Sequence, residues 1–137
     1  MARSSSKHPR SAAAQFIVRP LFAALVASGV IASEDPASAA TKAQAAFFAR
    51  DAAALGRLAT ATASWARSAN TREQYAHAYV QFRALQVAML QQRAKDSGKA
   101  GEACVDTLDA VLKREPKSAE ALALQSSCYG YLAGLGG

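Results

Sequence analysis

Cysteine and histidine, the residues that most often bind metals or act in catalysis, are scarce in this sequence of 137 residues. There are two of each, and His77 is the only histidine after the first ten residues. The chain has no C-x-x-C or C-x-x-C-H motif and no second histidine four residues from His77. Zinc binding, haem attachment and thioredoxin-type redox chemistry therefore lack their usual ligands. We expect no catalytic residue, no cofactor and no metal site, and hence a protein that is not an enzyme.

Proline and glycine are also few, with four and eight residues respectively. Half of the residues are hydrophobic. Many of these are alanines, which favour helices but bury little area. A chain of this length suffices for one domain with a modest core. The composition therefore predicts an all-α fold.

Basic residues outnumber acidic ones by six, but they form no long stripe. Residues 1–39 carry four basic and two acidic residues, so the rest of the chain has a net charge of about +4. Its charges are interspersed, as in Lys113-Arg114-Glu115, and no nucleic-acid recognition motif accompanies them. This pattern is typical of a solvated helix surface, and we expect no nucleic-acid partner.

The first 39 residues have the composition of a secretory signal peptide. Residues 1–19 are basic and serine-rich, and no acidic residue precedes Glu34. An apolar run follows over residues 21–32, which suits a signal peptide and is too short for a transmembrane helix of about 20 residues. We expect Sec-type export to the periplasm or beyond, with no stable membrane insertion after cleavage. An uncleaved anchor and a buried N-terminal helix are the alternatives.

Two positions fit a signal-peptidase cleavage site. Ala37-Ser38-Ala39 matches the A-x-A pattern of small residues, and cleavage there leaves Ala40 as the new N-terminus. Ile31-Ala32-Ser33 is a weaker match. The first position divides the chain into a signal peptide, residues 1–39, and a helical domain, residues 40–137.

Apolar periodicity predicts four helices in this domain, over residues of about 41–68, 72–95, 99–114 and 118–133. The apolar stripe of the first helix includes Phe48. Asn70 with Glu73, or Thr71 with Gln74, has the spacing of a capping box at the start of the second helix, and Ser118 is placed to cap the fourth. We expect Gly98 to follow the end of the second helix and Pro116 to end the third.

The two cysteines stand symmetrically about this proline. Cys104 and Cys128 each lie twelve residues from Pro116, on the two arms of a predicted antiparallel hairpin. Because a helix rises by about 1.5 Å per residue, both lie at nearly the same height above the turn. In an oxidising compartment this spacing predicts a disulfide that stabilises the domain by about 3 kcal/mol. Two buried free thiols are the alternative.

Residues 104–129 resemble the junction between two tetratricopeptide repeats. In such a junction, the second helix of a repeat carries, in order, a small residue, a large apolar residue, another small residue and a proline. A large residue, a Leu-Gly pair and a tyrosine then open the next repeat. The corresponding residues here are Cys104, Leu108, Val111, Pro116, Leu122, Gln125-Ser126 and Tyr129. Cysteine and valine replace the usual alanines, and Gln-Ser replaces Leu-Gly. The chain is thus similar to exported bacterial proteins with divergent repeats of this kind.

The resemblance implies a scaffold of helical hairpins that binds a protein or peptide partner and has no catalytic activity. Tyr75, Tyr79, Phe82 and Tyr129 are the candidates for a packing or partner-binding surface. The alternative is a compact periplasmic four-helix bundle that binds a small apolar ligand in its core. A repeat of this kind also needs a partner helix after residues 118–133, so truncation of a longer protein is a further hypothesis.

Overall fold

The computed structural model describes residues 34–136 of the chain. These residues form an all-α domain, as predicted, with five α-helices, one 3-10 helix and no strand. In chain order the elements are α2 (Pro36–Phe48), α3 (Ala52–Ala61), η1 (Ala63–Arg67), α4 (Thr71–Leu90), α5 (Ala94–Arg114) and α6 (Ala119–Leu135). None of these helices is long and apolar enough to span a membrane. The predicted signal segment lies outside the described residues except for its last six, 34–39, of which Pro36 to Ala39 open α2.

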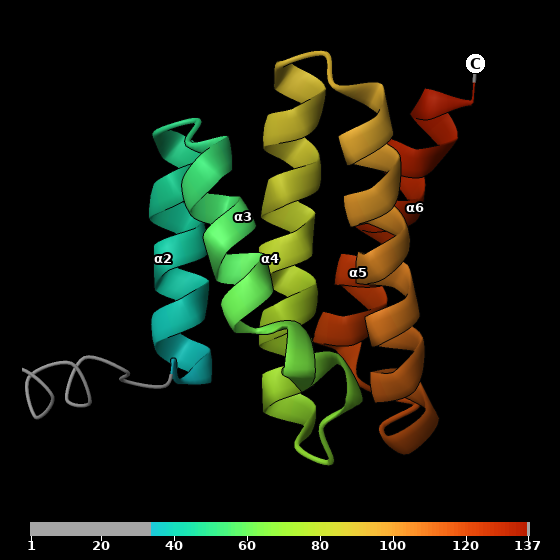
Figure 1. Cartoon of the computed structure of the whole chain (residues 1–137). Helices are drawn as coiled ribbons and strands as arrows, with labels where there is room; N and C mark the ends of the chain where they lie inside the picture. The colour runs from blue at the N-terminus through green and yellow to red at the C-terminus, as the bar shows by residue number, and fades with distance from the viewer. Residues whose placement is uncertain (1–33, 137) are drawn as a thin grey trace, which may run out of the picture. The chain divides into compact units, whose positions relative to one another are not determined.

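Successive helices alternate in direction, as Figure 1 shows. Two antiparallel hairpins, α2–α3 and α4–α5, follow one another, and α6 adds a fifth helix. The central helix α4 contacts every other element of the described domain, whereas α2 contacts α3 and α4, and α6 contacts α4 and α5. Because α2, α4 and α6 run in the same direction, the three helices also begin at the same end of the domain (Figure 1).

The first predicted helix, over residues 41–68, is wrong: the chain turns back at Ala49-Arg50-Asp51 and forms α2, α3 and η1 instead. Arg50 takes the left-handed conformation, with φ of 53°, and the amide of Asp51 donates to the carbonyl of Ala46 at 2.9 Å. This pattern closes the carboxyl end of a helix. The Asp51 side chain then accepts from the Ala54 amide at 2.9 Å and caps α3. Because the chain turns here, Phe48 does not share one apolar stripe with the residues of α3. Its side chain is 72% exposed and not in the core, contrary to the prediction.

The boundary between the second and third predicted helices is also wrong. The turn lies at Gln91-Gln92-Arg93, with Gln92 at a φ of 57°, and Gly98 lies inside α5. The amide of Arg93 donates to the carbonyl of Ala88 at 2.8 Å, which is again the hydrogen bond of a left-handed helix end. A glutamine supplies here the conformation that was expected of the glycine.

Three of the predicted helix boundaries are confirmed. Asn70 accepts from the amides of Arg72 and Glu73 and caps α4. Pro116 follows the end of α5, and the Ser118 side chain accepts from the amide of Ala121 at 3.3 Å at the start of α6. These caps satisfy amides that a helix leaves without an intrahelical partner.

The core consists of two clusters on either side of α4. One lies between α2, α3 and α4 and is rich in small residues: Ala39, Ala43, Ala46, Leu55, Leu58, Val80 and Val87. The other lies between α4, α5 and α6: Ala78, Cys104, Val105, Leu108, Val111, Ala121, Leu124 and Cys128. Since alanine side chains are short, α2 packs closely against α4.

Cys104 on α5 and Cys128 on α6 form a disulfide, as predicted, with their Cα atoms 6.5 Å apart. Both are fully buried at the centre of the second cluster. One turn of helix away, α5 approaches α6 so closely that a Cβ atom added to Gly101 would lie 2.6 Å from Cδ2 of Leu132. The two helices are thus held together by a covalent bond and by a small residue that permits close contact.

Candidate functional site

Helices α2, α4 and α6 share one face of the domain, which we call the α2–α4–α6 face. Its centre is a stripe of side chains on α4, formed by Tyr75, Tyr79, Phe82, Gln86 and Leu90. They are three or four residues apart and so lie on one side of the helix. The first four are half-buried, and Leu90 is 57% exposed.

Three of the four residues predicted for a packing or binding surface lie together on this face. Tyr75, Tyr79 and Phe82 pack against the cluster around the disulfide, and Tyr79 also borders the cluster of α2 and α3. Their inner edges therefore belong to the core, while their outer edges form the floor of the face.

Tyr129 lies elsewhere. Tyr131, two residues further on, packs edge-on against Phe82 with ring centroids 5.8 Å apart. Since successive residues of a helix are about 100° apart, Tyr129 points away from α4. It is 51% exposed, on the same side of α6 as Leu122, which is 45% exposed. Tyr131, which sequence reasoning missed, follows the buried Leu124 by seven residues, and this helical spacing could have identified it.

Arg83 joins α2 to α4 across the face. Its guanidinium lies 4.4 Å from the centre of the Phe47 ring and donates to Gln44 Oε1 at 2.5 Å. It also donates to the Tyr79 hydroxyl at 2.8 Å and to Gln86 Oε1 at 2.7 Å. The ion pairs of the described residues, Glu34–Lys42 and Arg93–Asp96, do not involve Arg83.

A chain of contacts continues from this arginine to α6. Gln86 donates from Nε2 to the Tyr131 hydroxyl at 3.0 Å, and Tyr79 donates to Gln44 on α2. Polar and aromatic contacts thus cross all three parallel helices. Sequence reasoning missed this network because its partners are 35 to 45 residues apart in the chain.

Hollows occur along the face. One of about 460 Å³ lies where α2, α4 and α6 begin, and it is bordered by Tyr75. A second, of about 370 Å³, lies between Thr41 and Gln44 of α2 and the two tyrosines of α4. A third, of about 350 Å³, lies at the other end and is lined by Phe47, Gln86, Met89, Leu90 and Tyr131. The face therefore has concave places at both ends and at its middle.

The two ends differ in character. The first hollow is lined by the carboxylates of Asp35, Glu115 and Glu120 and by the basic side chain of Arg72. The third hollow is lined mainly by apolar and aromatic side chains. Burial raises the pKa of Tyr75, and the nearby Glu120 carboxylate adds to this shift. The Tyr75 hydroxyl is protonated at neutral pH even at its ordinary pKa of 10, and the upward shift moves the loss of this proton to still higher pH. The face offers an acidic end and an apolar end.

His77 does not belong to this face. It is buried on another side of α4, where its Nδ1 atom lies 2.8 Å from the Thr62 hydroxyl at the end of α3. Burial lowers the pKa of His77, so its ring is neutral at pH 7. Within residues 34–136, no group of three His, Cys, Asp or Glu side chains is arranged to hold a metal ion.

No protein-family model, curated protein or solved structure matches this chain. The resemblance to tetratricopeptide repeats therefore stays a prediction.

Proposed function

We propose that this chain is an exported, non-catalytic helical scaffold of tetratricopeptide-like build, which binds a segment of a partner protein on its α2–α4–α6 face. The observation that carries the proposal is the combination of three parallel helices, a stripe of half-buried aromatic side chains and hollows on the same face. Stacked helical hairpins commonly use such a surface to bind partner segments.

The order of the helices supports the tetratricopeptide-like build. α2 and α3 form one hairpin and α4 and α5 the next, and α6 begins where a third would start. The first residues of α2 and α4 are 35 positions apart, close to the repeat length of about 34 residues. The second unit is longer because α4 and α5 have 20 and 21 residues.

No observation favours the alternative, a compact bundle that holds a small apolar ligand at its centre. In such a bundle the first helix would pack across the others. In the described domain, α2 contacts α3 and α4 but neither α5 nor α6.

Export is supported by two features that are independent of each other. One is the basic and then apolar composition of residues 1–33. The other is the buried disulfide, because structural disulfides persist in oxidising compartments such as the periplasm.

The chemistry of the face indicates what the partner segment carries. The carboxylates at one end favour a lysine or arginine side chain, and the hollow beside Leu90 favours an apolar or aromatic side chain. We therefore expect a segment with basic residues at one end and apolar residues at the other. Ordering of the scaffold's aromatic side chains adds little to the entropic cost of binding, because Tyr75, Tyr79 and Phe82 are already held by core contacts.

Photo-crosslinking in the exporting cell tests the proposal. A photoreactive amino acid is placed singly at Thr41 or Leu90, both exposed on the face, and as a matched control at Asp106, which is exposed on the outer side of α5. Cell fractionation first establishes that each variant is in the periplasm. We expect a discrete adduct of higher mass from the two face positions and none from the control. Equal adducts from all three positions would contradict binding through this face, and a chain retained in the cytoplasm would contradict export.

A further inference from the structure

Residues 34–39, which lie between the two candidate cleavage sites of the leader, make contacts in the folded domain. The sequence offers two cleavage sites, after Ala39 or just before Glu34. Ala39 is the fourth residue of α2 and is fully buried. The two sites therefore differ in whether the mature chain keeps the first turn of its first helix.

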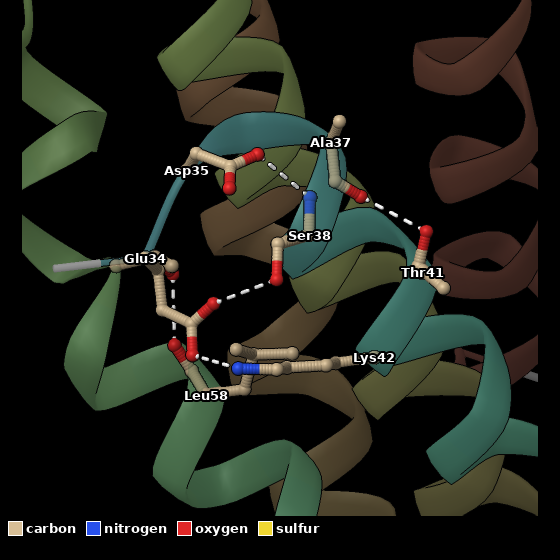
Figure 2. Close-up of polar contacts among 8 residues, drawn as sticks. Glu34, Asp35, Ala37, Ser38, Thr41, Lys42 and Leu58 are labelled. Atoms are coloured by element: carbon tan, nitrogen blue, oxygen red, sulfur yellow. Dashed lines mark hydrogen bonds and ion pairs between the residues drawn. The ribbon is translucent and has the colours of Figure 1, made fainter. Parts of the chain in front are cut away.

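Residues 34–39 span the N-cap and the first turn of α2, and Figure 2 shows the polar contacts of Glu34, Asp35 and Ser38 there. The Asp35 side chain accepts from the amide of Ser38 at 2.9 Å and caps the helix, and Pro36 occupies its first turn. Aspartate and proline are the residues that favour these two places. The Glu34 carboxylate accepts from Lys42 Nζ at 2.5 Å and from the Ser38 hydroxyl at 3.3 Å. Glu34, Asp35 and Pro36 thus contribute to the start of α2, and the buried Ala39 contributes to its packing.

Cleavage after Ala39 would remove these contacts. The helix would lose its cap and four of its 13 residues, Pro36 to Ala39. It would also lose the Ala39 methyl group from the core cluster with Ala43 and Leu55. The new α-amino group of Ala40 would place a positive charge at a helix N-terminus, where the helix dipole favours a negative one.

The sequence immediately before Glu34 fits the peptidase. Within the apolar run of residues 21–32, residues 21–27 are seven uninterrupted apolar residues, Ser28 and Gly29 interrupt them, and Val30-Ile31-Ala32-Ser33 follow. Small residues at positions 32 and 33 suit the place before a cleaved bond, and a run of seven is within the usual range of 7 to 15 for the hydrophobic region. Cleavage after Ala39 would instead leave the acidic residues Glu34 and Asp35 inside the leader.

From these observations we infer that signal peptidase hydrolyses the peptide bond before Glu34 or before Ser33, and not the bond after Ala39. Water supplies the hydroxyl group of the new leader carboxylate and the proton of the new α-amino group. The mature chain then keeps Asp35 as the cap of α2. This inference rests on the proposed export of the chain.

The test is the N-terminus of the exported protein. The full chain, with its own leader and a C-terminal affinity tag, is produced in a Gram-negative host and purified from the periplasm. Intact mass and N-terminal sequencing should give Ser33 or Glu34 as the first residue. Ala40 as the first residue would overturn the inference while leaving export intact. An unprocessed chain in the cytoplasm would instead contradict the proposed export.

Two variants locate the cleaved bond independently. Replacing both small residues, Ala32→Tyr with Ser33→Tyr, should raise the amount of unprocessed precursor at least several-fold. The matched control is Ala37→Tyr, which places a large side chain in the Ala37-Ser38-Ala39 motif at an exposed position and should be processed like the native chain. Precursor accumulation in the control but not in the double variant would overturn the inference. Both results are read from the sizes of precursor and product, so they do not depend on how stable the folded variants are.

Discussion

Loss of the Cys104–Cys128 disulfide should cost this domain a large share of its stability. The bond closes a loop across 24 positions of the chain. In the chain-entropy description, a loop of this length stabilises the folded state by about 3.5 kcal/mol, because it restricts the unfolded chain. Small domains have about 5 to 15 kcal/mol in total. For a domain of this size the loss corresponds to a fall in Tm of roughly 15 °C.

Thermal unfolding of the oxidised and reduced protein measures this loss. Both sulfur atoms are fully buried, so the reductant has to be added to the denatured protein, which is then refolded in its presence. The double variant Cys104→Ala/Cys128→Ala is the control, because the reductant should leave its Tm unchanged. The variant itself should unfold at or below the Tm of the reduced native chain, since it also loses two buried sulfur atoms.

Two results would refute this reasoning. One is an unchanged Tm after reduction, which would mean that the loop does not limit the unfolded chain. The other is the titration of two free thiols per chain in denatured protein that has never been reduced, which would mean that the bond does not form.

Three further predictions concern single side chains, each measured by urea unfolding. Gly98→Ala should stabilise the domain by roughly 0.5 to 1 kcal/mol, because alanine favours the helix and nothing lies within 4 Å of the added Cβ. Gly101→Ala gains the same helix preference, but its Cβ must displace the Leu132 side chain, so it should be neutral or destabilise the domain by up to about 2 kcal/mol. Equal effects would contradict the close approach of α5 and α6. Burial lowers the pKa of His77 below its ordinary 6.5, so the unfolded chain binds the proton more readily. Stability should therefore fall as the pH drops below about 6.5, by at most about 1.4 kcal/mol per pH unit, until the pH reaches the folded pKa, and His77→Gln should lack this slope. Arg83→Met should lower the free energy of unfolding by about 1 to 2 kcal/mol through lost stacking and hydrogen bonds, and Arg83→Lys should recover part of this loss; no change in Arg83→Met would contradict its role in joining α2 to α4.

The part of the fold around Pro116 could be predicted from the sequence because local chemistry decides it. Proline cannot continue a helix, serine at position 118 caps the next one, and the equal spacing of the two cysteines then brings them together. Each of these steps needs only residues that are close in the sequence.

The two turns that the sequence did not reveal have residues without a turn preference at their left-handed positions. Arg50 and Gln92 both take positive φ values, which non-glycine residues adopt uncommonly. Each left-handed residue lets the next amide donate back to the helix it closes, Asp51 to Ala46 and Arg93 to Ala88, without a glycine or proline at the turn. Gly98 carried the stronger local signal for a turn, but it lies within α5.

Part of the candidate site was predictable because it depends on residues that are close in the sequence. Tyr75, Tyr79 and Phe82 have helical spacing, so their common side of α4 can be read from the sequence. Which residues complete the face depends on how α2 and α6 pack beside α4. That packing brings in Arg83 and Tyr131 and turns Tyr129 away.

The measurement that tests the central claim most directly is the yield of the photo-crosslinked adduct in the periplasm from Leu90 compared with that from Asp106. Binding through the α2–α4–α6 face predicts a discrete adduct from Leu90 that is at least several times stronger than any adduct from Asp106. Equal yields from the two positions, or an adduct from Asp106 alone, would contradict it.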